Sequence, residues 1–128
     1  MKFLTGRVAT LQAEASLIPQ IAAIAAATAK YRNLAGALAD GYVYAGVDCI
    51  PTAGIHYVRG SWPSDDLLDP LQPEFLMYAP GAGGLTLVAV EYAVPTRFRR
   101  PTFLGGTFEE YAGGPGEPIW GLHIGSGN

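Results

Sequence analysis

Apolar side chains recur every three or four residues between positions 21 and 38, a spacing typical of one face of an α-helix. Pro19 suits a first helical turn, and Gly41 suits the left-handed residue that ends a helix. We therefore predict a helix over residues 19–40. A separate short helix at 8–15 is favoured over one unbroken rod, because proline disrupts a helix interior. The stripe expected to face the core is Ile21, Ile24, Thr28, Tyr31, Leu34 and Leu38.

Beyond Gly41 the pattern changes to short runs of Val, Ile, Tyr, Phe and Trp bounded by Gly and Pro, which is typical of β-strands. The clearest unit is a β-hairpin, in which residues 74–78 and 85–94 flank a glycine-rich turn at 79–84. Further strands are expected at 42–47, 55–59 and 119–124, and long surface loops at 61–73 and 96–118.

The composition agrees with one domain built from two unlike halves. The chain has 128 residues, of which 49% are hydrophobic, enough for one core. Twelve alanines precede Gly41, whereas nine of the ten prolines follow it. We expect a single α+β domain over 1–128. Its N-terminal helical segment, 1–41, packs on a curved antiparallel sheet of about four to five strands formed by residues 42–128. The curvature could be strong enough to make the sheet barrel-like.

Charge and motifs exclude several classes of protein. A net charge of −3 and a pI near 5.2 do not suit a nucleic-acid partner. The most apolar run, residues 21–29, is shorter than the roughly 20 residues that span a bilayer, so no membrane span is expected. The single cysteine, Cys49, excludes an internal disulfide framework. The glycines at 81–84 lack the lysine of a phosphate loop, so we expect a turn there and no nucleotide cofactor.

Several short motifs point to a family. They are Gly54-Ile-His-Tyr-Val58, Pro73-Glu-Phe-Leu-Met-Tyr78, the Val-Glu-Tyr run that ends at Tyr92, and Leu122-His123. With these motifs the chain, over about residues 27 to 125, resembles a group of small uncharacterised bacterial proteins, many of which carry secretion signals. The resemblance implies an extracytoplasmic location, although residues 1–8 do not show the apolar run of a signal peptide.

Three ionisable residues on three expected strands have mostly small neighbours on their own strand face. They are His56, Glu91 and His123. Alternate residues of a strand point the same way, so the neighbours two positions away are Gly54, Val58, Ala89, Ala93, Gly121 and Gly125. We predict that the three side chains converge over a shallow pocket on an open sheet face, while the bulky face packs on the helix.

Two chemistries remain open for these residues. Two histidines and one carboxylate can bind a divalent metal ion, or they can form an acid–base group around a small ligand. Tyr78, Tyr92 and Trp120 are further candidates for ligand contacts. A lone histidine or glutamate is more often a separately hydrogen-bonded surface or core residue, so the pattern shared by three strands is what points to one site.

The sequence favours a domain that binds a small-molecule ligand, and it leaves open whether the domain is an enzyme that uses the three residues as catalytic groups. The alternative is a non-catalytic structural or interaction domain that forms a homo-oligomer through a sheet face or an exposed edge. A pocket that encloses the three ionisable groups supports the first function. An apolar face sealed by a second copy supports the alternative.

Overall fold

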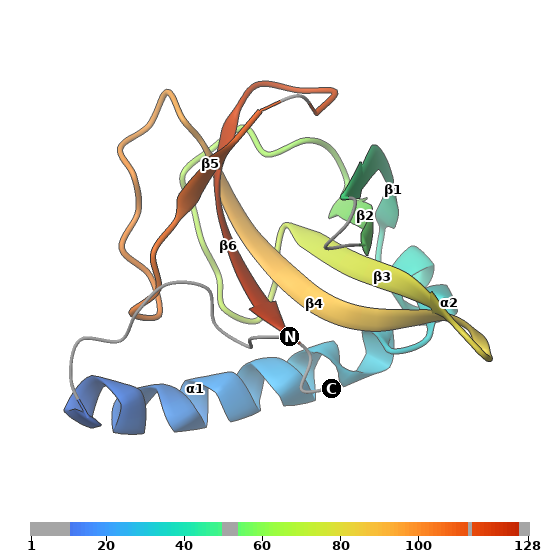
Figure 1. The fold of residues 1–128 in the computed structure, drawn as a ribbon, viewed down its shortest axis with the longest axis horizontal. Helices are drawn as coiled ribbons and strands as arrows, with labels where there is room; N and C mark the ends of the chain where they lie inside the picture. The colour runs from blue at the N-terminus through green and yellow to red at the C-terminus, as the bar shows by residue number, and fades with distance from the viewer. Residues whose placement is uncertain (1–10, 50–53, 113, 126–128) are drawn as a thin grey trace.

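The computed structural model describes residues 11–49, 54–112 and 114–125. Its elements are α1 (Leu11–Thr28), η1 (Ala29–Tyr31), α2 (Leu34–Ala39), β1 (Tyr42–Cys49), β2 (Gly54–Arg59), β3 (Phe75–Gly81), β4 (Gly84–Pro95), β5 (Glu109–Tyr111) and β6 (Ile119–Gly125). The six strands form one curled antiparallel sheet in the order β1-β2-β3-β4-β6-β5, with α1 running beneath it (Figure 1). The α+β fold on a curved antiparallel sheet is confirmed.

Every strand expected from the sequence is present. The β3–β4 hairpin extends further into the glycine-rich segment than expected, since the two strands pair as far as Gly81 and Gly84. Gly84 has a φ of 111°, a backbone conformation that favours glycine. The sixth strand, β5, lies inside the segment 96–118 that we expected to be a loop, and it pairs with β6 at the edge of the sheet.

The helical segment differs from the prediction at its start and in its middle. Helix α1 begins at Leu11 and keeps Pro19 in its interior, so the prediction of a separate helix at 8–15 is wrong for the described residues. An interior proline costs about 3 kcal/mol. The alanines around it have the highest helix propensity of any residue, which favours continuation of the helix.

The predicted helix over 19–40 is also wrong, because the chain breaks between α1 and α2. Asn33 caps the start of α2, where its side-chain oxygen accepts a hydrogen bond from the Ala35 N–H at 3.0 Å. A Cβ on Gly36 would lie 2.0 Å from the Lys30 carbonyl oxygen. Only glycine therefore lets α2 pack this closely against η1. Gly41 ends the helical segment with a φ of 92°, as expected.

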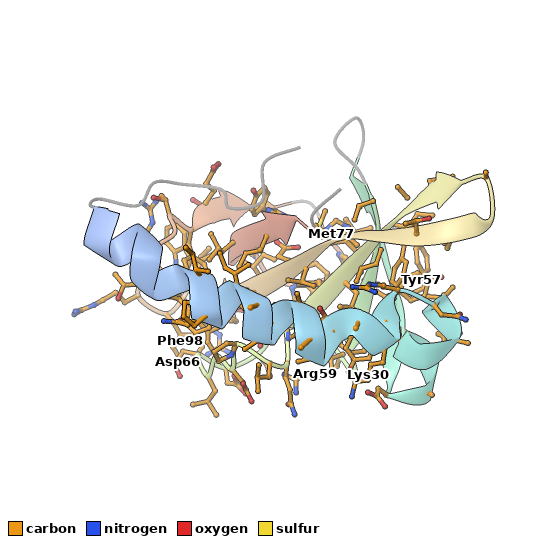
Figure 2. The ribbon with its side chains drawn as sticks, turned by 90° about the horizontal axis from the view of Figure 1, so that it is seen from below. Lys30, Tyr57, Arg59, Asp66, Met77 and Phe98 are labelled. Atoms are coloured by element: carbon orange, nitrogen blue, oxygen red, sulfur yellow. The ribbon has the colours of Figure 1, made fainter. Side chains whose placement is uncertain are left out.

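The main core lies between the helical segment and one face of the sheet, and Figure 2 shows from below how α1 crosses in front of that face. The buried members of this core are Ile24, Tyr31, Ala37, Tyr42, Leu76, Tyr78, Leu87, Val90, Tyr92, Leu104, Phe108, Leu122 and Ile124. Leu38 was expected in the core and is 50% exposed, because α2 does not continue the line of α1. The bulky strand face thus packs on the helices as predicted.

None of the helices in the part of the chain that the structure describes is long and apolar enough to span a membrane.

Candidate functional site

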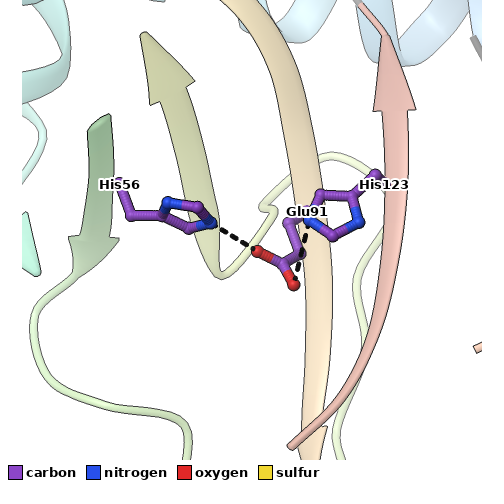
Figure 3. Close-up of side chains that lie close together, drawn as sticks. All are labelled: His56, Glu91 and His123. Carbon is purple, nitrogen blue, oxygen red and sulfur yellow. Dashed lines mark ion pairs between the residues drawn. The ribbon is translucent and has the colours of Figure 1, made fainter. Parts of the chain in front are cut away.

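The three predicted residues lie together on the sheet face that points away from α1. Glu91 on β4 is paired directly with His123 on β6. His56 on β2 is paired with Met77 on β3, and Phe75 of that strand is paired with Glu91. The register therefore brings His56 to Glu91 diagonally across β3 (Figure 3).

The Glu91 carboxylate lies between the two imidazole rings, and each of its oxygens faces one ring. His56 Nε2 is 3.2 Å from Oε1, and His123 Nε2 is 3.3 Å from Oε2 (Figure 3). The two rings stand almost at right angles, with centroids 6.5 Å apart. The predicted convergence of the three side chains is confirmed.

The cluster is buried, so the predicted open and shallow pocket is wrong. The side chains of His56, Glu91 and His123 are 5%, 3% and 14% exposed. A second apolar cluster occupies this face and includes Phe75, with Trp62 packed against it. The Phe75 ring contacts His56 edge-on at 5.6 Å between centroids, and Trp62 contacts Phe75 at 5.3 Å. His123 is the most exposed of the three side chains.

The floor beneath the carboxylate consists of small residues, as the sequence predicted. Ala89 and Ala93 are fully buried next to Glu91 on β4. A Cβ on Gly121 would lie 2.4 Å from Glu91 Oε2 and 3.0 Å from two ring carbons of Tyr111. The absence of a side chain at Gly121 is therefore what makes room for the carboxylate and the tyrosine ring.

The buried charges stabilise one another. Burial alone would raise the pKa of the Glu91 carboxyl, but His123 and His56 together outweigh burial and lower that pKa to about 2. Burial lowers the pKa of His123, whereas the charge and hydrogen bonding of Glu91 raise it, with a smaller contribution from Glu109, and the net direction is upward. Glu91 is therefore held as a carboxylate near neutral pH.

The outer nitrogen of each imidazole also has a partner. His56 Nδ1 is 3.2 Å from the Gly54 carbonyl oxygen, and His123 Nδ1 is 3.3 Å from Tyr111 Oη. Both Nε2 atoms, by contrast, point at Glu91. Glu91 Oε1 is nevertheless the one buried side-chain polar atom of the described residues that has no hydrogen-bond partner. It lies close to His56 Nε2 without the alignment of a hydrogen bond.

The arrangement has the geometry of a possible metal site. One ligand atom from each of His56, Glu91 and His123 can be chosen so that all three lie within 4.8 Å of one another. Two imidazole nitrogens and a carboxylate are donors that zinc and iron(II) accept in proteins.

The three aromatic residues predicted to assist are not brought to this cluster. Tyr78 and Tyr92 belong to the helix-covered core, and Trp120 packs against it. The Tyr78 hydroxyl donates to the Tyr31 carbonyl, and the Tyr92 hydroxyl donates to the Pro70 carbonyl. These side chains anchor the helical segment and a loop to the sheet.

Sequence reasoning missed Tyr111, which reaches the site from β5. Its ring meets His123 edge-on, with centroids 5.2 Å apart and an interplanar angle of 89°. Phe75 was also missed, although the alternation in residues 74–78 would have placed it on one face of its strand. No comparable signal marks Tyr111, because its strand is three residues long within a segment rich in glycine and proline.

Comparison of the chain with protein-family models, with curated proteins and with solved structures finds no match. The family resemblance and the extracytoplasmic location therefore stay predictions.

Proposed function

We propose that the domain binds one divalent metal ion through His56 Nε2, Glu91 and His123 Nε2, and that a small ligand is bound and activated at the ion. The observation that carries the proposal is the buried carboxylate oxygen of Glu91, which faces an imidazole nitrogen without a hydrogen bond. Buried polar atoms are normally paired, so such an atom calls for an explanation.

The hydrogen position on His56 gives the physical reason. A carbonyl oxygen only accepts hydrogen bonds, so the contact with Gly54 places the hydrogen on His56 Nδ1. In the neutral ring, Nε2 then carries a lone pair that faces the lone pairs of Glu91 Oε1 at 3.2 Å. A cation converts this repulsion into attraction, whether it is a metal ion between the two atoms or the proton on Nε2 with which His56 lowers the pKa of Glu91. An imidazole that binds metal through Nε2 while donating its Nδ1–H to a carbonyl is a common arrangement.

Two of the spacings between donor atoms match those around a small metal ion. Donors about 2.0 to 2.1 Å from a tetrahedral zinc ion lie about 3.3 Å from one another. The two nitrogen–oxygen distances are 3.2 and 3.3 Å. The three ligand atoms lie within 4.8 Å of one another, so binding of one ion requires the carboxylate and the imidazoles to close toward the spacing of about 3.3 Å.

Three protein donors leave a coordination position for water or a ligand, as in catalytic zinc sites. A bound ion would polarise a carbonyl or phosphoryl oxygen, or lower the pKa of a bound water molecule. The chain's contribution is to exclude bulk water and to fix the donors. The slightly exposed side of His123 is the route by which a small ligand would reach the ion.

Zinc binding to the chelator-treated protein tests the proposal. We expect native mass spectrometry to show one zinc ion per chain, and calorimetry to show saturable binding. Zinc at about 100 times its Kd should stabilise the fold by about 2.7 kcal/mol. Glu91→Gln, which removes the charged donor with little change in shape, should abolish binding.

The matched control is Glu110→Gln, because Glu110 is an exposed carboxylate on β5. This variant should bind zinc as the parent does. Circular dichroism establishes that each variant is folded. A folded parent that binds no zinc, or a Glu91→Gln variant that binds it equally well, would exclude the proposed site.

Self-association remains the second candidate function, and one observation favours it. Strand β1 is at the edge of the sheet, and it exposes 47% of Val43 and 54% of Tyr44. An exposed strand edge is a template for pairing with another chain. The same mass spectra report the subunit count, so a dimer without bound metal would favour this function over the metal site.

A further inference from the structure

The two histidines of the cluster are held in different ways. The outer nitrogen of His56 contacts a backbone carbonyl, which can only accept, so its hydrogen position is fixed. The outer nitrogen of His123 contacts the hydroxyl of Tyr111 at 3.3 Å, and a hydroxyl can either donate or accept. His123 is therefore the ring whose two tautomers are both compatible with its partner.

Tyr111 is itself placed by the same features that form the site. Its ring carbons lie over Gly121, next to the point where Glu91 Oε2 lies. Its ring also packs edge-on against the imidazole of His123. The phenol thus forms the outer wall of the cluster on the side of β5, and both its ring and its hydroxyl restrain His123.

We infer that Tyr111 is the positioning residue of the metal site, and that its hydroxyl allows His123 to exchange a hydrogen bond to Glu91 for a bond to the ion. In the metal-free state the hydroxyl donates to Nδ1, and His123 Nε2–H faces Glu91 Oε2. In the metal-bound state the hydrogen is on Nδ1 and is donated to Tyr111 Oη, which frees the Nε2 lone pair for the ion. The inference rests on the proposed function.

This role distinguishes Tyr111 from a residue that only fills space. Removing the hydroxyl leaves the ring, the wall and the packing over Gly121 intact, but it removes the partner of His123 Nδ1. Removing a partner that orients a metal-binding histidine lowers the metal affinity about tenfold to hundredfold. A purely structural role would give no loss of affinity on removal of one oxygen atom.

The test compares Tyr111→Phe with Tyr57→Phe. Tyr57 precedes Val58 on β2 and packs against the helix-covered core, so the control makes the same chemical change next to His56 but on the opposite face. We expect Tyr111→Phe to weaken zinc binding by about tenfold to hundredfold and Tyr57→Phe to leave it unchanged. Equal zinc affinity of Tyr111→Phe and the parent would overturn the inference while leaving the metal site intact.

A second measurement does not need the metal. Long-range nitrogen–hydrogen NMR correlations of the metal-free protein report which nitrogen of each histidine carries hydrogen. We expect Tyr111→Phe to change the His123 pattern by shifting the Nδ1 resonance, because that nitrogen loses its hydrogen bond while Nε2–H still faces Glu91. The pattern of His56, whose partner is a backbone carbonyl, should be preserved. If the parent binds no zinc, the proposed function fails, and this measurement still decides the role of Tyr111. An unchanged His123 pattern would show that Tyr111 does not position it.

Discussion

Replacing Gly121 with alanine perturbs the site through a single added methyl group. The new Cβ would lie 2.4 Å from Glu91 Oε2 and 3.0 Å from two ring carbons of Tyr111. These separations are shorter than van der Waals contact, so the carboxylate and the phenol must both move. The carboxylate is held between two imidazoles, and a shift away from Gly121 lengthens its 3.3 Å contact with His123.

Gly121→Ala should destabilise the fold because the packed site has no room for an added methyl group. Overpacking of a buried position by one methyl group costs about 1 to 3 kcal/mol. Urea unfolding of Gly121→Ala should therefore show a loss in this range. Gly83→Ala is the matched control, since Gly83 lies in the β3–β4 turn and an added Cβ meets nothing within 4 Å. The control should be neutral or slightly stabilised.

A double-mutant comparison assigns the cost to the carboxylate. In a Glu91→Ala background one of the two clashes is absent, so Gly121→Ala should be less costly there than in the parent. Equal stability of Gly121→Ala and Gly83→Ala in the parent, or the same cost of Gly121→Ala in both backgrounds, would refute the view that the carboxylate occupies the space above Gly121.

Two further predictions concern the core and the charges. Ile24→Ala should lower the free energy of unfolding in urea by about 2 to 5 kcal/mol because Ile24 is buried. Leu38→Ala should lower it far less because Leu38 is half-exposed. Equal losses would contradict the break between α1 and α2. In metal-free protein at a series of pH values, the stability that Glu91 contributes should be present above pH 4.5 and lost as the pH falls toward its pKa of about 2, because the folded state lowers that pKa. The contribution of His123, whose pKa is raised, should be complete below pH 6.5 and lost as the pH rises through its folded-state value. Burial raises the pKa of the Glu74 carboxyl to about 7, so Glu74 also makes the stability depend on pH. Subtracting the stability–pH profile of Glu91→Gln from that of the parent removes this effect. A difference that does not change with pH would contradict the coupling of Glu91 to the histidines.

The site could be predicted from sequence because strand alternation is a local property. His56, Glu91 and His123 each follow a period of two within a strand long enough to show it. The same alternation places Tyr92 on the bulky face, which is why its prediction as a ligand contact is wrong. What alternation does not give is the pairing register, which here brings side chains from β2, β4 and β6 to one carboxylate.

The parts that were not predicted depend on contacts between distant segments. The site is buried because Trp62, from the loop after β2, packs on Phe75 and donates its indole N–H to the Glu117 carbonyl at 2.8 Å. The break between α1 and α2 reflects the close approach of Gly36 to Lys30. Neither contact leaves a periodic pattern along the chain, so the sequence predicted an open sheet face and an unbroken helix over residues 19–40.

The metal site can be tested most directly by a crystal structure of the chelator-treated protein after zinc has been restored, with anomalous diffraction measured at the zinc edge. The account predicts one anomalous peak about 2.0 to 2.2 Å from His56 Nε2, His123 Nε2 and an oxygen of Glu91. A cluster that keeps its direct contacts between Glu91 and both imidazoles, with no anomalous peak among them, would contradict it.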